Sequence, residues 1–250
     1  MSQDKQQILR EHKVIPDVLP EGTQLSYDLK VKFPDTTLDA PGKELGREET
    51  QPEPKLFLSP PPKEERSDYV LILTDPDLMA DNDQNFGQVR HWLSTNVSVK
   101  NDGELAVQSS TPNDISPYIG PAPLPNYVSP RPHRYIFILA RPASGGPDQV
   151  SVSAEDLQKL QEPYAAAFKG AQKADVQDLK DRWGFNTQKF LESKGLKVEA
   201  ATFMLVGGTL KSAAANVMMS GQAMANKVEF APSVPAQATL LTVDRLWVNK

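Results

Sequence analysis

The chain has 250 residues, of which 39% are hydrophobic and 24% charged, and it carries a formal net charge of −5 with an isoelectric point near 5.3. This composition suffices for one sizeable hydrophobic core, whereas the acidic balance argues against a nucleic acid or an anionic membrane surface as partner. The chain contains no cysteine, which excludes disulfides, thiol nucleophiles, zinc fingers and iron–sulfur clusters.

The amino-terminal segment is polar and charged, and it lacks the apolar run followed by small residues that marks a secretory signal. No segment reaches the roughly 18 apolar residues that a membrane-spanning helix needs. We therefore expect a cytoplasmic protein without a transmembrane segment. Residues 4–13 predict one short helix, which Pro16 ends because proline lacks an N–H and restricts the residue before it.

Five segments have strand character. Residues 23–33 alternate apolar and polar side chains with the period of two that is typical of a half-buried strand. Four further segments are short, rich in β-branched or aromatic residues, and bounded by proline, glycine or aspartate. These are residues 69–74, 89–99, 134–140 and 199–206.

Helices are expected between the last two of these strands. Residues 153–156, Ser-Ala-Glu-Asp, predict a capping box, and the following residues favour a helix apart from Pro163. Asn186 or Thr187 can cap a second helix that runs to Lys194, with Gly195 at the left-handed position after its end. Residues 208–250 are rich in alanine and methionine and predict a C-terminal extension.

Two acidic and three ring-bearing residues form the candidate site. Asp75 and Asp77 flank a proline at the end of one predicted strand, while His91 lies within another and His133 and Tyr135 begin a third. If these strand ends meet, two carboxylates, two imidazoles and a phenol converge, as they do in many small-ligand sites.

Three functional interpretations fit this set of residues. An anion pocket would use the histidines as donors, with an aspartate orienting one ring. A hydrolase would pair an aspartate with a histidine to activate a nucleophile, but the chain has neither a G-x-S-x-G motif nor a cysteine. A metal site would use two histidines and one or two carboxylates, although the spacing fits no metal-binding motif.

Each candidate residue also has an ordinary structural explanation. An Asp-Pro-Asp sequence after a strand is commonly a turn in which the aspartate oxygens accept bonds from nearby N–H groups. A histidine on a strand is more often a satisfied core or surface residue than a ligand, and Tyr135 can simply pack with its hydroxyl at the rim.

Four motifs occur in a diagnostic order: LILTDPD, then HW within a strand, then GPAP, then HRYIFIL. In this order they resemble the phosphatidylethanolamine-binding protein family. The segments LREHKVIPDVLP, GFNTQKFLESKGL and EAATFMLV are similar to other parts of that family, so the resemblance covers about residues 9–141 and 183–207. The amino-terminal segment most resembles the branch of the fungal carboxypeptidase Y inhibitor.

The resemblance implies a mainly β fold with a large antiparallel central sheet, a second small sheet and peripheral helices. It also implies a pocket that binds phosphate or phospholipid head groups. Two departures occur, since Leu78-Met79-Ala80 replaces the usual Ala-Pro-Ser and Pro132 replaces a common glycine. The residues carried over as ligand-binding are Asp75 and Asp77 in the turn, His91, Gly120 and Pro121 in the wall, and His133 with Tyr135 on the second side.

We therefore expect a non-catalytic binding or regulatory protein, without cofactor or metal, that recognises a small anion or a phosphorylated head group. The resemblance further suggests a protease or kinase as protein partner, with serine carboxypeptidase inhibition as the specific expectation. We expect a domain over residues 1–207 with an inserted helical segment at about 142–182. The alternative is a vestigial pocket, with the inserted helices and the C-terminal extension serving a larger assembly.

Overall fold

The structure of the protein, a computed structural model, describes residues 3–78, 80–107, 113–123, 131–143, 149–168 and 181–208. The expected C-terminal extension after residue 208, and residues 144–148 and 169–180 of the expected insertion, lie outside the described residues. The division into a domain, an insertion and an extension therefore stays a prediction.

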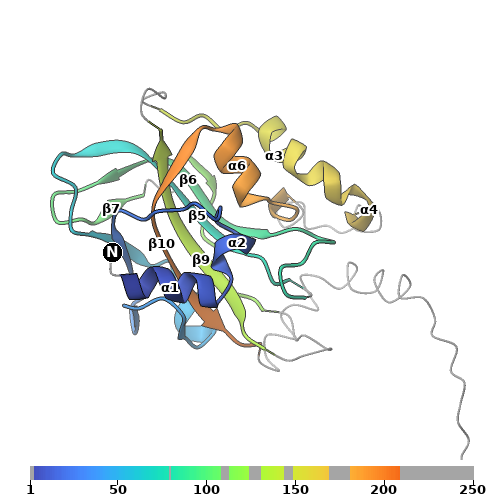
Figure 1. Cartoon of the computed structure of the whole chain (residues 1–250), viewed down its shortest axis with the longest axis horizontal. Helices are drawn as coiled ribbons and strands as arrows, with labels where there is room; N and C mark the ends of the chain where they lie inside the picture. Colours follow the sequence, from blue (N-terminus) through green and yellow to red (C-terminus); the bar gives the residue numbers. More distant parts are fainter. Residues whose placement is uncertain are drawn as a thin grey trace, which may run out of the picture.

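A seven-stranded sheet forms the centre of the described part of the molecule (Figure 1). Its order is β3-β10-β9-β5-β6-β7, and β8 pairs with β6. The long strands pair antiparallel, and only the short β3 runs parallel to its neighbour β10 among the described strands. The strands are β3 (Lys43–Glu44), β5 (Arg66–Asp75), β6 (Val89–Val99), β7 (Leu105–Ala106), β8 (Asp114–Ser116), β9 (His133–Pro142) and β10 (Leu196–Val206).

A three-stranded antiparallel sheet packs against one face of the central sheet. Its order is β2-β1-β4, and the β1–β4 pairing runs from Asp28 opposite Ser59 to Lys32 opposite Lys55. Side chains of this small sheet and of the central sheet form one apolar cluster, which includes Val31 and Leu71. The strands are β1 (Asp28–Lys32), β2 (Thr37–Leu38) and β4 (Lys55–Ser59).

Helices cover the opposite face of the central sheet. Leu9 of α1 and Phe190 of α6 share a second apolar cluster with Ile72 and Ile138 of the central strands. In Figure 1 α1, α2 and α6 lie in front of the sheet. The helices are α1 (Gln3–Glu11), α2 (Val14–Asp17), α3 (Ala154–Gln161), α4 (Ala165–Phe168) and α6 (Thr187–Ser193), with 3-10 turns η1 (Glu48–Thr50) and η2 (Glu162–Tyr164).

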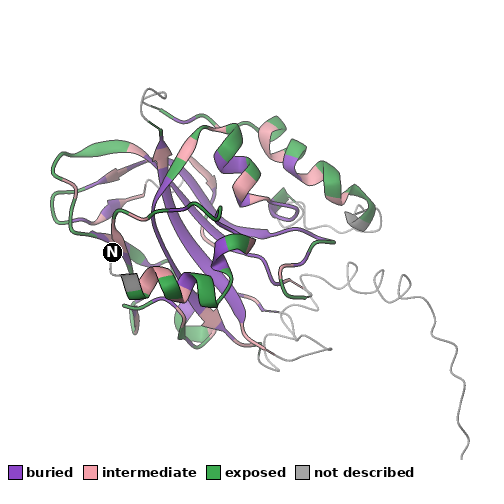
Figure 2. Cartoon of the chain, in the orientation of Figure 1, coloured by how far each residue is buried: buried purple, intermediate pink, exposed green. Residues whose placement is uncertain are grey.

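The central strands are buried on both faces because they lie between these two layers. Alternate residues of β5 enter opposite clusters, Leu71 and Leu73 toward the small sheet and Val70 and Ile72 toward the helices. Figure 2 shows these strands as buried along most of their length, while the outer sides of the helices are exposed. Each fully buried leucine or isoleucine contributes about 1.5–3 kcal/mol relative to exposure. The expected fold class, a large antiparallel sheet with a small sheet and peripheral helices, is confirmed.

Most predicted elements form close to their predicted bounds. The predicted capping box is present, since Ser153 accepts a bond from the Asp156 N–H and Asp156 accepts one from the Ser153 N–H. Asn186 caps α6, and Gly195 after it has a φ of 60°. The prediction of a strand over all of residues 23–33 was wrong at its beginning. The N–H groups of Ser26 and Tyr27 both bond the Glu199 carbonyl, so the chain joins the sheet only from Asp28.

Candidate functional site

The Asp-Pro-Asp sequence ends β5 and makes a tight turn. Oδ1 of Asp75 accepts a hydrogen bond of 2.7 Å from the backbone N–H of Asp77. The carbonyl of Pro76 accepts another from the N–H of Asp83. The structural explanation for this sequence is therefore correct, but it uses only one oxygen of Asp75.

The second oxygen of Asp75 holds His133. Nδ1 of His133 donates to Oδ2 of Asp75 at 2.9 Å, and both side chains are buried. His133 begins β9 and Asp75 ends β5, so the antiparallel pairing of these strands brings the two residues to the same edge. The carboxylate thereby fixes the orientation of the imidazole and places its proton on Nδ1.

A β-bulge positions His91. Leu73 pairs with Trp92 and Thr74 pairs with Arg90, so His91 is the extra residue on β6. Because a bulge re-aims side chains, His91 and Trp92 both reach the small-sheet side, where strict alternation would have separated them. The bulge also frees the His91 carbonyl from the ladder, and this oxygen accepts from the Ile119 N–H at 3.0 Å. In return Nδ1 of His91 donates to the Ile119 carbonyl at 2.9 Å.

Tyr135 lies between the two imidazoles. Its ring centroid is 5.1 Å from that of His91, edge to face, and 6.4 Å from that of His133, nearly parallel. Its buried hydroxyl makes no hydrogen bond of full geometry among the described residues, but the Asp75 carboxylate and the Ala122 backbone lie close enough to interact with it. Burial, together with the nearby Asp75 carboxylate, raises the pKa of Tyr135 well above its ordinary value, so the phenol remains a donor at neutral pH. We call Asp75, His91, His133 and Tyr135 the histidine cluster.

The histidine cluster is nearly closed to solvent. His91 is 7% exposed, and the other three members are 2% exposed or less. Burial lowers the pKa of His91 below its ordinary value and outweighs the opposite effect of the Asp75 carboxylate. His91 is therefore neutral at pH 7, with its proton on Nδ1, and its Nε2 can accept a bond, or donate one once protonated.

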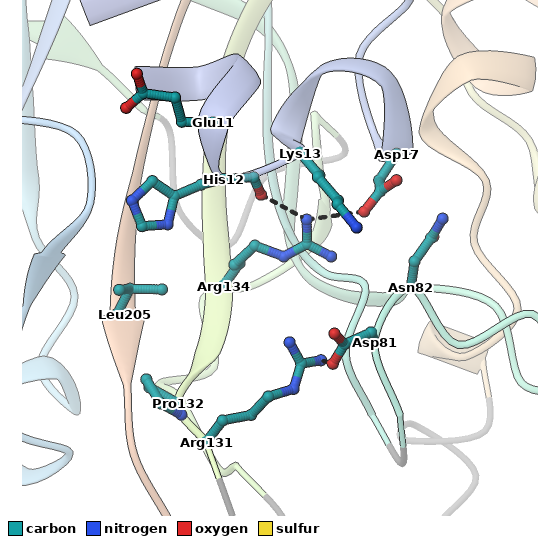
Figure 3. Close-up of a pocket in the computed structure, with 10 residues that line it drawn as sticks. All are labelled: Glu11, His12, Lys13, Asp17, Asp81, Asn82, Arg131, Pro132, Arg134 and Leu205. Carbon is teal, nitrogen blue, oxygen red and sulfur yellow. Dashed lines mark hydrogen bonds and ion pairs between the residues drawn. The ribbon is translucent and has the colours of Figure 1, made fainter. Parts of the chain in front are cut away.

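Asp77 faces the opposite side of the sheet. Its two oxygens accept bonds of 2.7 and 2.8 Å from the guanidinium of Arg134, and Arg134 also donates to the His12 carbonyl and to Asp17 (Figure 3). Burial alone would raise the pKa of Asp77, but the bonds from Arg134 outweigh it and hold that pKa low. Asp77 thus joins β5 to the N-terminal helices rather than joining the histidine cluster.

Gly120 and Pro121 border the cluster through their backbone. They follow Ile119, whose carbonyl holds His91. A Cβ on Gly120 would lie 2.8 Å from Cα of Gln51, so only glycine permits this close approach. The Gln51 side chain in turn donates to the Pro121 carbonyl at 2.9 Å. This loop therefore fixes the position of His91.

Sequence reasoning missed three residues that support the site. Ile119 holds the His91 ring, Arg134 clamps the turn, and Arg182 donates to the carbonyls of His91 and Pro117 at 3.2 and 2.9 Å. Arg134 lay within a recognised motif and could have been found there. Arg182 has no local signal, because it reaches the cluster from 91 positions along the chain.

Two features are absent from the described part of the chain. In the ranges that the structure describes, no three His, Asp or Glu side chains are arranged to hold a metal ion. In the same ranges, no helix is long and apolar enough to cross a membrane.

The chain is similar to known proteins in sequence and in fold. The uncharacterized protein YLR179C of Saccharomyces cerevisiae is 25% identical over 155 residues, which are 60% of this chain and 75% of the yeast protein. The carboxypeptidase Y inhibitor, solved in complex with its cognate proteinase, has a similar fold, with a TM-score of 0.59, 19% identity, and coverage of 84% of this chain and 97% of the inhibitor.

The phosphatidylethanolamine-binding protein of Plasmodium vivax also has a similar fold, with a TM-score of 0.53, 21% identity, and coverage of 81% and 97% of the two chains. Residues 20–191 match the sequence profile of the phosphatidylethanolamine-binding proteins, and this range contains the whole histidine cluster. The chain therefore belongs to the phosphatidylethanolamine-binding protein family.

Proposed function

We propose that this protein binds a small anion, phosphate or the phosphate of a head group such as phosphoethanolamine, at the histidine cluster, and that it does so without catalysis. The observation that carries the proposal is the arrangement of His91 and Tyr135. The Ile119 carbonyl occupies Nδ1 of His91, which leaves Nε2 as the ring nitrogen for a ligand, and the phenol beside it is a retained donor.

An anion that binds beside His91 would bring a proton with it. His91 is neutral in the free protein because burial lowers its pKa. An anion beside the ring would favour the protonated imidazole, which then becomes a donor at Nε2. The low exposure of the cluster would strengthen hydrogen bonds from its groups to a ligand, because water competes with them little.

A non-catalytic role is supported by what the sequence lacks. The chain has no cysteine and no G-x-S-x-G motif, so it lacks a thiol nucleophile and the serine motif of one class of hydrolases. The Asp75 carboxylate orients His133, which suits an orienting role in binding as well as it would suit a catalytic pair. The four residues of the histidine cluster include no serine, threonine or lysine, which supports binding rather than hydrolysis.

Calorimetric titration of phosphate and of phosphoethanolamine into the full chain tests the proposal. We expect binding by the wild type, and a loss of about tenfold or more in affinity for His91→Gln, since one hydrogen bond to a charged group is removed. The matched control is His12→Gln, because His12 lies on the helix side of the sheet and its ring packs on Phe203. Absence of binding by the wild type would overturn the proposal and favour the vestigial pocket with an assembly role.

Protease inhibition is the second candidate function, and one comparison favours it. The carboxypeptidase Y inhibitor that shares this fold was solved with its cognate proteinase, and the alignment covers 97% of that inhibitor. We propose a serine carboxypeptidase as protein partner on this ground. Peptide hydrolysis by carboxypeptidase Y should fall as this protein is added. Full activity at roughly 10 µM added protein, far above the nanomolar range of typical inhibitor complexes, would exclude this partner.

A further inference from the structure

A cavity lies on the other face of β9 from the histidine cluster. It has a volume of about 510 Å³, within the usual range for small-ligand sites. Residues 11–17, the turn after β5 and the start of β9 contribute its walls (Figure 3). We call it the N-terminal pocket. Its lining residues are Glu11, His12, Lys13, Asp17, Asp81, Asn82, Arg131, Pro132, Arg134 and Leu205.

The guanidinium groups of this pocket are already paired. Arg134 lies between Asp77 and Asp17, and Arg131 forms an ion pair with Asp81. The two guanidinium groups are therefore matched by carboxylates, and Lys13 and Glu11 add one further charge of each sign to the lining, so the pocket has no surplus of positive charge. Such a balanced set of charges favours neither the binding of a phosphate dianion nor that of a simple cation.

The lining also offers polar groups besides these guanidinium groups, Glu11 and His12 among them, and three of them suit a ligand with two charged ends. Within the described residues, Nζ of Lys13 and the side-chain amide of Asn82 make no hydrogen bond or ion pair. Oδ2 of Asp17 accepts from Arg134, and its Oδ1 has no bond among these residues. Two donors and one carboxylate oxygen thus face one cavity, which suits a ligand that carries both a carboxylate and an ammonium.

The backbone at this pocket supports a role in binding. Lys13 and Asn82 have φ values of 54° and 45°, two of the three positive values for non-glycine residues in the described chain. Surrounding bonds hold both residues, since the Lys13 N–H donates to the Arg10 carbonyl and the Asn82 N–H donates to Asp77. Such conformations persist where the structure fixes them, and they concentrate at ligand clamps.

We propose that the N-terminal pocket binds a small zwitterion of the class of a short peptide with free ends. Lys13 and Asn82 bind its carboxylate, and Asp17 binds its ammonium. An apolar side chain of the ligand packs on Leu205 and Pro132, which form the apolar part of the wall. The site is separate from the histidine cluster, because Arg134 and His133 are adjacent on β9 and point to opposite faces.

Amide NMR titration of the full chain with glycyl-leucine tests this proposal. The N-acetylated and the C-amidated dipeptides are the ligand controls, since each lacks one charge. We expect saturable shifts at residues 12–17 and 81–82 with glycyl-leucine, and affinities about tenfold weaker or worse with either blocked dipeptide. Equal binding of all three dipeptides, or shifts elsewhere only, would overturn it.

Protein variants separate this site from the histidine cluster. Lys13→Gln should weaken glycyl-leucine binding about tenfold, and Asn82→Gly should weaken it while retaining the positive φ. Lys63→Gln, on the exposed loop between β4 and β5, is the matched control and should bind normally. His91→Gln should also bind glycyl-leucine normally. Wild-type affinity in Lys13→Gln would overturn the assignment of the carboxylate site.

Discussion

His133 and Asp75 are diagonal neighbours on β9 and β5, and their side chains bond at 2.9 Å across 58 positions of sequence. The other oxygen of Asp75 accepts from the Asp77 N–H, so one carboxylate fixes both the turn and the imidazole. Because both contacts are buried, neither is weakened by competition with solvent.

Asp75→Asn should therefore reduce anion affinity. The amide keeps the shape of the side chain but loses the charge that orients His133. We expect a loss of roughly 10- to 100-fold, by analogy with partners that orient metal-bound histidines. Calorimetric titration of phosphate measures the effect. Asp68→Asn on the same strand is the control. Unchanged phosphate affinity in a folded Asp75→Asn protein would mean that Asp75 only stabilises the turn.

The pH dependence of stability reports the state of His91. Burial lowers its pKa in the folded protein below the ordinary value of 6.5. Between these two pKa values the imidazole of His91 binds more protons in the unfolded chain than in the folded protein. His91 therefore makes the free energy of unfolding fall as the pH falls below 6.5. Urea unfolding at several pH values should show this fall in the wild type and a smaller one in His91→Gln.

The effect of sulfate on stability provides a complementary measurement, because sulfate keeps its charge between pH 5.5 and pH 7.5. If it binds beside His91, it favours the protonated ring, and sulfate should then stabilise the protein more at pH 5.5 than at pH 7.5. Equal stabilisation by sulfate at both pH values in the wild type would contradict the contact with His91.

Periodicity and turn chemistry predicted the long strands because those signals are local. Residues 89–99 form β6 with the predicted bounds, and the Asn186 cap is present as expected. The bulge at His91 could not be predicted in this way, because it depends on the pairing of β6 with β5. Without the bulge, a period of two would place His91 and Trp92 on opposite faces of the sheet.

The separation of Asp77 from the histidine cluster could not be predicted from the sequence either. Asp75 and Asp77 are two positions apart and would share a face if the strand continued. The strand ends at Asp75, however, and the turn directs Asp77 toward Arg134. Four of the residues carried over from the family resemblance lie together in the structure: Asp75, His91, His133 and Tyr135. Their role as ligands stays a prediction.

Substitution of Gly120 tests whether the loop that holds His91 can adjust. A methyl group at this position would lie 2.8 Å from Cα of Gln51 and 2.9 Å from the Thr50 carbonyl oxygen, and neither backbone atom can move cheaply. Gly120→Ala should therefore lower the free energy of unfolding by about 1–3 kcal/mol, measured by urea denaturation. Gly22→Ala is the matched control, because no atom lies within 4 Å of its Cβ position. Equal stability of the two variants would mean that the loop adjusts.

Arg134 should have the largest effect on stability of any single ion-pairing residue discussed above. It donates to both oxygens of Asp77 as well as to Asp17, and its side chain is 8% exposed. Arg134→Met leaves the Asp77 carboxylate buried without its partner, so we expect a loss of roughly 3–5 kcal/mol in the free energy of unfolding. Urea denaturation measures this loss, and Arg10→Met is the control because its pair with Glu21 is exposed and contributes about 1 kcal/mol at most.

Acid unfolding gives an independent measure of the same contact. In the wild type Arg134 holds the pKa of Asp77 below its ordinary value of 3.8, so this contribution to stability is present above pH 3.8 and is lost as the pH falls through the lowered value. In Arg134→Met burial acts alone and raises that pKa, so the acid transition should move to higher pH. An unchanged acid transition together with a small loss of stability would show that Asp77 finds another partner and that Arg134 does not hold the N-terminal helices to the turn.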